Sequence, residues 1–214
     1  MNTSVARIAR SLLAGLVLLA GPAAHALDLV EGVNYKTLKP AQPTNVAPGK
    51  VEVVEVFWYA CGHCYLLEPS LAAWERKGKA ANVELVRLPA TWNDMLKSHA
   101  RVFYTIEILG KPQLHDEVFR EMNVRGNRLE TPEKIEAFFV ARGVSKAEFQ
   151  KAFSGFAVES KLARAVDLNR RYRITSTPTV IVNGRYVTDA GMAGSEGKLF
   201  EVINALAARE KPAA

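Results

Sequence analysis

Short apolar runs that are rich in β-branched residues mark the strands of a sheet in this sequence. The first, Val51–Tyr59 (VEVVEVFWY), is almost uninterrupted, which is typical of a central strand covered on both faces. The second, Val83–Leu88 (VELVRL), ends at Pro89. A helix is expected between them from Gly62 to Lys77, kinked by Pro69. This order predicts a right-handed parallel crossover.

A third strand and a hairpin are predicted near the end of the chain. Residues Thr179–Val182 form the strand, Asn183-Gly184 favours a type I′ turn, and Arg185–Val187 pairs back. Ser195 is expected to cap a last helix that runs to about Arg209. The chain therefore returns to the sheet after a long interval.

That interval, residues 90–172, has almost no strand pattern and predicts helices only. Thr131 is an N-cap followed by Pro132 at the first helical position, and Ser145 with Glu148 has the spacing of a capping box. The expected helices are Lys97–Leu109, Gln113–Met122, Thr131–Arg142, one opening at Ser145, and Val158–Tyr172. The pattern as a whole predicts an α/β domain with an inserted helical subdomain.

The first 26 residues have the features of a secretory signal peptide. Arg7 and Arg10 precede the apolar run Ser11–Ala20, and Ala24-His25-Ala26 has the small-x-small form of a cleavage site. The alternative is a membrane anchor, but the run is shorter than the roughly 20 residues that a span needs. We therefore expect residues 1–26 to be removed and residues 27–214 to form one domain.

The net charge of the chain adds little to these expectations. Removal of the signal peptide takes away two arginines and no acid, which lowers the formal net charge from +6 to +4. The only dense basic cluster is Arg170-Arg171-Tyr172-Arg173, whose position suits the carbonyl end of a helix. Nucleic-acid binding is therefore not expected.

The only two cysteines, Cys61 and Cys64, stand at the start of the first predicted helix. A strand before and a helix after a pair with this spacing is the context of a thioredoxin-type redox motif. A structural disulfide closing so short a loop would add little stability, because it removes little loop-closure entropy. A closed zinc site is not expected, because these two side chains and His63 are too few and too tightly spaced.

Glu55 is an acid within an apolar central strand. A carboxyl group there should have a raised pKa or a specific role. The alternative is that Glu55 points to the rim of the sheet and is solvated.

Several of these features together resemble the DsbA family of periplasmic thiol–disulfide oxidoreductases. The resemblance covers essentially all of the chain after residue 26. Its elements are Glu55 six residues before Cys61, Phe57-Trp58-Tyr59, Cys61-Gly62-His63-Cys64-Tyr65, the helical insertion, and Thr177-Pro178-Thr179 entering the Asn183-Gly184 hairpin. It implies a thioredoxin-like fold with an inserted helical subdomain at about residues 90–172.

The chemistry of the pair follows from where it sits. Cys61 is the candidate nucleophile, because helix N-terminal amides, the helix dipole and a charged His63 would stabilise its thiolate. Cys64 is the resolving cysteine, more buried and held as a thiol. A stabilised thiolate stabilises the reduced form, which makes the disulfide a stronger oxidant.

The resemblance assigns roles to further residues. It implies a cis bond before Pro178 that faces the disulfide and leaves the Thr177 backbone open to an extended substrate. Gly62, Thr177 and Pro178 are thus expected at the substrate site, and Glu55 beneath it, assisting proton movement at Cys64. Gly62 and Thr177 replace the proline and valine of the best-known members, and because the residue between the cysteines tunes the potential, the disulfide is expected to be a somewhat weaker oxidant than theirs.

The expected function is a periplasmic thiol oxidase that donates the Cys61–Cys64 disulfide to reduced, unfolded exported proteins. It would need no bound cofactor and would act as a monomer, reoxidised by a quinone-linked membrane partner resembling DsbB. Trp58 and Tyr59 are assigned to the core or the groove wall. The alternatives are a disulfide isomerase or reductase with the same site, although residues 27–50 are too few for a dimerisation domain, and a non-catalytic peptide-binding or chaperone module.

Overall fold

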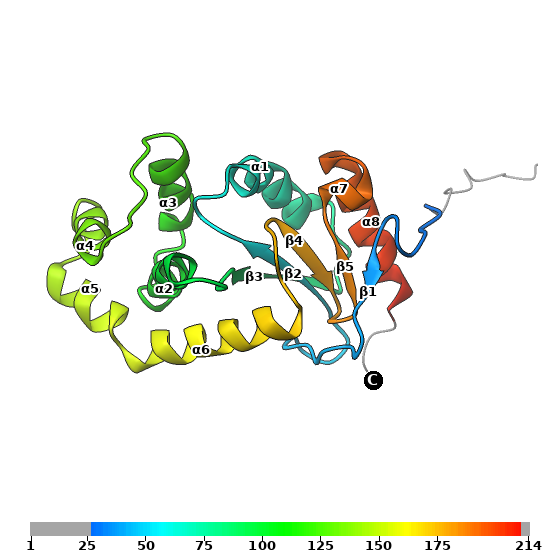
Figure 1. Ribbon diagram of the computed structural model, residues 1–214, viewed down its shortest axis with the longest axis horizontal. Helices are drawn as coiled ribbons and strands as arrows, with labels where there is room; N and C mark the ends of the chain where they lie inside the picture. The colour runs from blue at the N-terminus through cyan, green and yellow to red at the C-terminus, as the bar shows by residue number, and fades with distance from the viewer. Residues whose placement is uncertain (1–26, 211–214) are drawn as a thin grey trace, which may run out of the picture.

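The computed structural model describes residues 27–210, so the expected signal peptide lies outside the described residues. Five strands form one mixed sheet in the order β1-β5-β4-β2-β3 (Figure 1). The strands are β1 (Lys36–Thr37), β2 (Val51–Phe57), β3 (Val83–Pro89), β4 (Thr179–Val182) and β5 (Tyr186–Thr188). β2 and β3 are parallel, and the other neighbouring pairs are antiparallel. The parallel pairing of β2 with β3 across the helix and the β4–β5 hairpin are both confirmed.

Helices cover both faces of the sheet (Figure 1). They are α1 (Gly62–Lys77), α2 (Asp94–Ile108), α3 (Leu114–Asn123), α4 (Pro132–Val140), α5 (Lys146–Phe153), α6 (Phe156–Arg171), α7 (Ala190–Ala193) and α8 (Glu196–Arg209). Alternate residues of β2 point to opposite faces. Val51 and Val53 pack in a cluster with α1 and α8, whereas Val54 and Val56 pack in a cluster with the helical insertion. The central strand is therefore buried on both sides.

Helices α2 to α6 lie between β3 and β4 in the chain, which confirms the helical insertion. α2 begins three residues before the predicted start, because the Asn93 side chain accepts a hydrogen bond from the Leu96 amide at 2.9 Å. β2 ends at Phe57 rather than Tyr59, because the chain turns there and the Cys61 amide donates to the Trp58 carbonyl. α1 continues through Pro69 without a break. Within residues 27–210, no helix combines the length and apolarity needed to cross a bilayer.

The β4–β5 hairpin turns as its sequence predicts. Asn183 and Gly184 have φ angles of 51° and 62°, the positive values of a type I′ turn. The Gln42 amide donates a hydrogen bond to the Gly184 carbonyl at 2.8 Å. A Cβ atom at position 184 would overlap the backbone carbonyl of Gln42. The turn therefore requires glycine for its backbone conformation and for its close approach to the segment before β2.

Candidate active site

Cys61 is the N-cap of α1, directly after the turn that ends β2. Its sulfur accepts a hydrogen bond from the Cys64 amide at 3.4 Å. As a thiol, it donates to the Thr177 carbonyl oxygen, also at 3.4 Å. Cys61 is half-buried and Cys64 is fully buried, and the two are free thiols. The structure thus represents the reduced form of the pair.

The different surroundings of the two thiols shift their pKa values in opposite directions. Hydrogen bonds from the Cys64 thiol, from the Thr177 side chain and from the amides of Cys64 and His63 outweigh burial and lower the pKa of Cys61 to about 5. Burial, with donation of the Cys64 thiol to Cys61, holds the pKa of Cys64 far above its usual value. At neutral pH, Cys61 is a thiolate and Cys64 is a thiol. This is the arrangement that a nucleophile and a resolving thiol require.

The backbone amide of His63, rather than its imidazole, contributes to the acidity of Cys61. The side chain of His63 is exposed. Its ring is not among the main groups that shift the Cys61 pKa, whereas its amide is. Redox tuning by the imidazole therefore remains a prediction.

Glu55 lies in the middle of β2 and has no exposed surface, so the solvated alternative is wrong. Burial, followed by the nearby charge of Glu68, raises its pKa to about 8. Neither carboxyl oxygen has a hydrogen-bond partner, and Arg87 Nε lies 3.7 Å from Oε2. At neutral pH Glu55 therefore holds a proton in the interior. The charge on Cys61 helps to raise the pKa of Glu55, and the charge on Glu55 helps to raise the pKa of Cys64.

The bond between Thr177 and Pro178 is cis, as predicted. A pocket joins this loop to the exposed side of α1 and to the start of α7. Its lining is His63, Leu66, Leu67, Ser176, Thr177, Pro178, Asp189, Ala190, Gly191 and Glu196. Thr177 and Pro178 thus share one surface depression with His63. Gly62 is exposed beside it, and nothing lies within 4 Å of where its Cβ would be.

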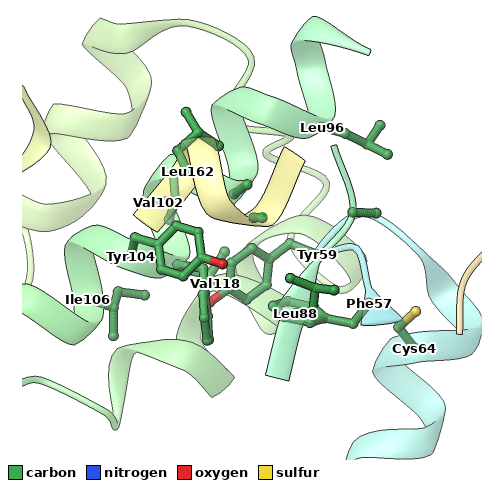
Figure 2. Close-up of a cluster of buried hydrophobic side chains, with 14 of the residues drawn as sticks. Phe57, Tyr59, Cys64, Leu88, Leu96, Val102, Tyr104, Ile106, Val118 and Leu162 are labelled. Carbon is green, nitrogen blue, oxygen red and sulfur yellow. The ribbon is translucent and has the colours of Figure 1, made fainter. Parts of the chain in front are cut away.

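Tyr59 is buried and Trp58 packs on the same core, as expected for core or wall residues. Figure 2 shows Cys64 at the edge of this cluster, with Phe57 beside it. Trp58 Nε1 donates to Nδ1 of the buried His99 at 2.8 Å. The aromatic residues before the cysteines therefore anchor the active-site turn to the helical insertion.

A cluster of ionisable side chains next to Glu55 was not predicted from the sequence. It consists of Glu68 on α1, Arg87 on β3 and His115 on α3. Two members of this cluster could have been found from their positions. Glu68 follows Cys64 by four residues and so shares its helix face, and Arg87 is a charge within an apolar strand that pairs in register with Glu55. His115 has no such signal, because only the tertiary packing of α3 brings it there.

In the part of the chain that the structure describes, no cluster of three or more His, Cys, Asp or Glu is suited to hold a metal ion.

Comparisons with known proteins agree with this geometry. Residues 75–196 match the model of the DSBA-like thioredoxin domain family. The thiol:disulfide interchange proteins DsbA of Pseudomonas aeruginosa and Pseudomonas syringae pv. tomato are 36% and 38% identical to this chain, each match covering 92% of both proteins. The crystal structure of Pseudomonas aeruginosa DsbA superposes with a TM-score of 0.79 at 35% identity, covering 85% of this chain and 94% of that one. The chain therefore belongs to the DsbA family and is a thiol–disulfide oxidoreductase.

Proposed function

We propose that this oxidoreductase works as an oxidant, donating the Cys61–Cys64 disulfide to reduced, unfolded proteins in the periplasm. The observation that carries the proposal is the low pKa of Cys61. Because the thiolate is stabilised in the dithiol form, reduction of the disulfide is favourable, and the pair takes electrons from substrate thiols. A pair without this stabilisation would be a weaker oxidant.

The transfer needs two exchanges. A substrate thiolate attacks the Cys61 sulfur, the bond to Cys64 breaks, and Cys64 leaves as a thiolate that takes up a proton. A second substrate thiolate then attacks the substrate sulfur of the mixed disulfide, and Cys61 leaves as a thiolate. Two electrons pass from the substrate to the pair, and the substrate gains a disulfide. In this scheme Glu55 supplies the proton that Cys64 takes up.

The substrate is proposed to lie against Gly62, Thr177 and Pro178. The Thr177 carbonyl is 3.4 Å from the Cys61 sulfur, so a chain joined to that sulfur passes directly over this loop. The adjoining pocket has apolar walls from Leu66 and Leu67 that suit an unfolded segment. His63 borders the same pocket and contributes to the poise of the pair.

The supporting partners are proposed from the family. The enzyme uses no cofactor besides its own cysteine pair, is a monomer, and is reoxidised by a quinone-linked membrane protein similar to DsbB. It has no nucleic-acid partner. Its export depends on residues 1–26.

Stoichiometric transfer tests the direction of the reaction. The oxidised protein is mixed with a reduced, unfolded protein that regains activity only when its disulfides form. We expect substrate oxidation to be faster than with the same concentration of oxidised glutathione, and the Cys64→Ala variant to trap a mixed disulfide through Cys61. Oxidation no faster than with glutathione would contradict the proposal. So would a Cys61→Ala variant that traps the mixed disulfide through Cys64 as readily as Cys64→Ala traps it through Cys61.

A further inference from the structure

His115 is held in one orientation by contacts on both ring nitrogens. Its Nδ1 lies 2.8 Å from the Tyr59 hydroxyl, and its Nε2 lies 3.3 Å from Oε1 of Glu68. When Tyr59 donates to Nδ1, the Nε2–H is free to donate to Glu68. Aromatic rings enclose the imidazole at centroid distances of 5.1–5.8 Å, those of Phe57, Tyr59, Phe103 and Phe119. The ring therefore presents a fixed donor to Glu68.

Arg87 is shared among three carboxylates, and only one of them receives a hydrogen bond. Its Nη2 donates to Oε2 of Glu68 at 3.2 Å. The approaches to Glu55 and Glu75 are longer, at 3.7 Å and 3.8 Å. Arg87 Nε, the atom nearest Glu55, is buried without any hydrogen-bond partner. The guanidinium of Arg87 and the carboxyl group of Glu55 are thus close to each other but not hydrogen-bonded.

We propose that His115 is a positioning residue, which holds Glu68 on Arg87 and so prevents Arg87 from closing on Glu55. The relevance of this to catalysis rests on the proposed role of Glu55 as the proton donor to Cys64. Nothing in the fold besides His115 and Arg87 hydrogen-bonds the Glu68 side chain within the described residues. Glu68 also borders a surface pocket between α1 and α3, so a released side chain has solvent to turn into.

Release of Glu68 would affect Glu55 in two ways, both in the same direction. Arg87 would be free to pair with the Glu55 carboxylate, and the negative charge of Glu68 would move away from it. An approaching cation and a departing anion each favour the ionised form, so the pKa of Glu55 would fall. The other charged groups around His115 are Asp116 beside it and Glu107 on α2, which line the same pocket as Arg87. Within residues 27–210, the hydrogen bonds to the Glu68 carboxylate come from Arg87 and His115 and not from these two groups.

A matched pair of variants separates the two hydrogen bonds of His115. The amide nitrogen of Gln can occupy the place of Nε2, whereas the shorter Asn side chain reaches only the place of Nδ1. The His115→Gln variant should therefore keep the donor to Glu68, and His115→Asn should lose it. The readout is the titration of the Glu55 carboxyl carbon by NMR in the reduced, isotopically labelled full-length protein.

We expect the Glu55 midpoint to fall by about one pH unit or more in His115→Asn and to stay near the wild-type value in His115→Gln. Equal midpoints in both variants and the wild type would overturn the proposal, as would equal shifts in both. If His115→Asn does not fold, the Tyr59→Phe variant provides the test. Loss of the hydroxyl removes the contact to Nδ1 and loosens the His115 ring, so the Glu55 midpoint should fall by a smaller amount. An unchanged Glu55 midpoint in Tyr59→Phe would overturn the proposal. The titration needs no substrate, so its failure is distinct from failure of the oxidant role.

Discussion

Cys61 and Cys64 have the same side chain, and their environments alone give them different chemistry. Cys61 ends a turn where amides and the Thr177 side chain converge on its sulfur. Cys64 lies one helical turn further and is sealed by the core. The sequence predicted this asymmetry from the position of the pair at a helix start. It could not predict the contribution of Thr177, because that residue comes from a distant loop.

The acidity of Cys61 can be measured directly. Thiolate absorbance of the reduced protein should titrate with a midpoint of about 5. The Thr177→Val variant removes a hydrogen bond that lowers this pKa, so its midpoint should rise by roughly half a unit to one unit. A Cys61→Ala variant, which lacks the titrating thiol, is the control. A midpoint near the ordinary thiol value would contradict our explanation of the site.

The buried Glu55 should make stability depend on pH. Its folded pKa of about 8 lies above the value of 4.5 expected for the unfolded chain. The stability that the neutral carboxyl contributes is therefore complete below pH 4.5 and is lost as the pH rises through about 8. Relative to Glu55→Gln, the reduced wild type should lose about 3 kcal/mol by neutral pH. Denaturant unfolding of both proteins between pH 4 and pH 9 measures this, and parallel curves would refute a raised pKa.

At the scale of elements, local signals predicted much of the structure. The capping box of Ser145 and Glu148 and the N-cap Thr131 are both formed. The missed element, α7, is a single turn of four residues that contains a glycine, too short for a periodic pattern. Caps and turns depend on neighbours in sequence, and for this reason they were predictable.

The β4–β5 turn offers a test at this scale. Gly184→Ala should destabilise the protein by about 3 kcal/mol or more, because a positive φ is combined with a clash against the Gln42 carbonyl. Gly126→Ala is the matched control: its φ is 73°, but its Cβ would meet open space. There the cost should be only the left-handed strain, about 1 kcal/mol. Similar losses of unfolding free energy in both variants would show that the contact with Gln42 does not matter.

At the scale of the whole molecule, the order of elements was predictable and the interior of the site was not. The strand–helix–strand pattern, the helical insertion and the hairpin each follow from runs of residues. The contacts among Glu55, Arg87, Glu68 and His115 join β2, β3, α1 and α3. Such contacts require the register of the sheet and the packing of the insertion on it. A charge in an apolar strand shows that a partner is needed, but not which residue it is.

The equilibrium of the Cys61–Cys64 pair with glutathione, followed by tryptophan fluorescence, tests the account most directly. A stabilised Cys61 thiolate predicts a reduction potential well above the roughly −270 mV of thioredoxin, toward the roughly −120 mV quoted for DsbA, the family to which this chain belongs. Such a value would support a disulfide donor. A potential near that of thioredoxin would contradict the account, because the low pKa of Cys61 would then not make the disulfide a stronger oxidant.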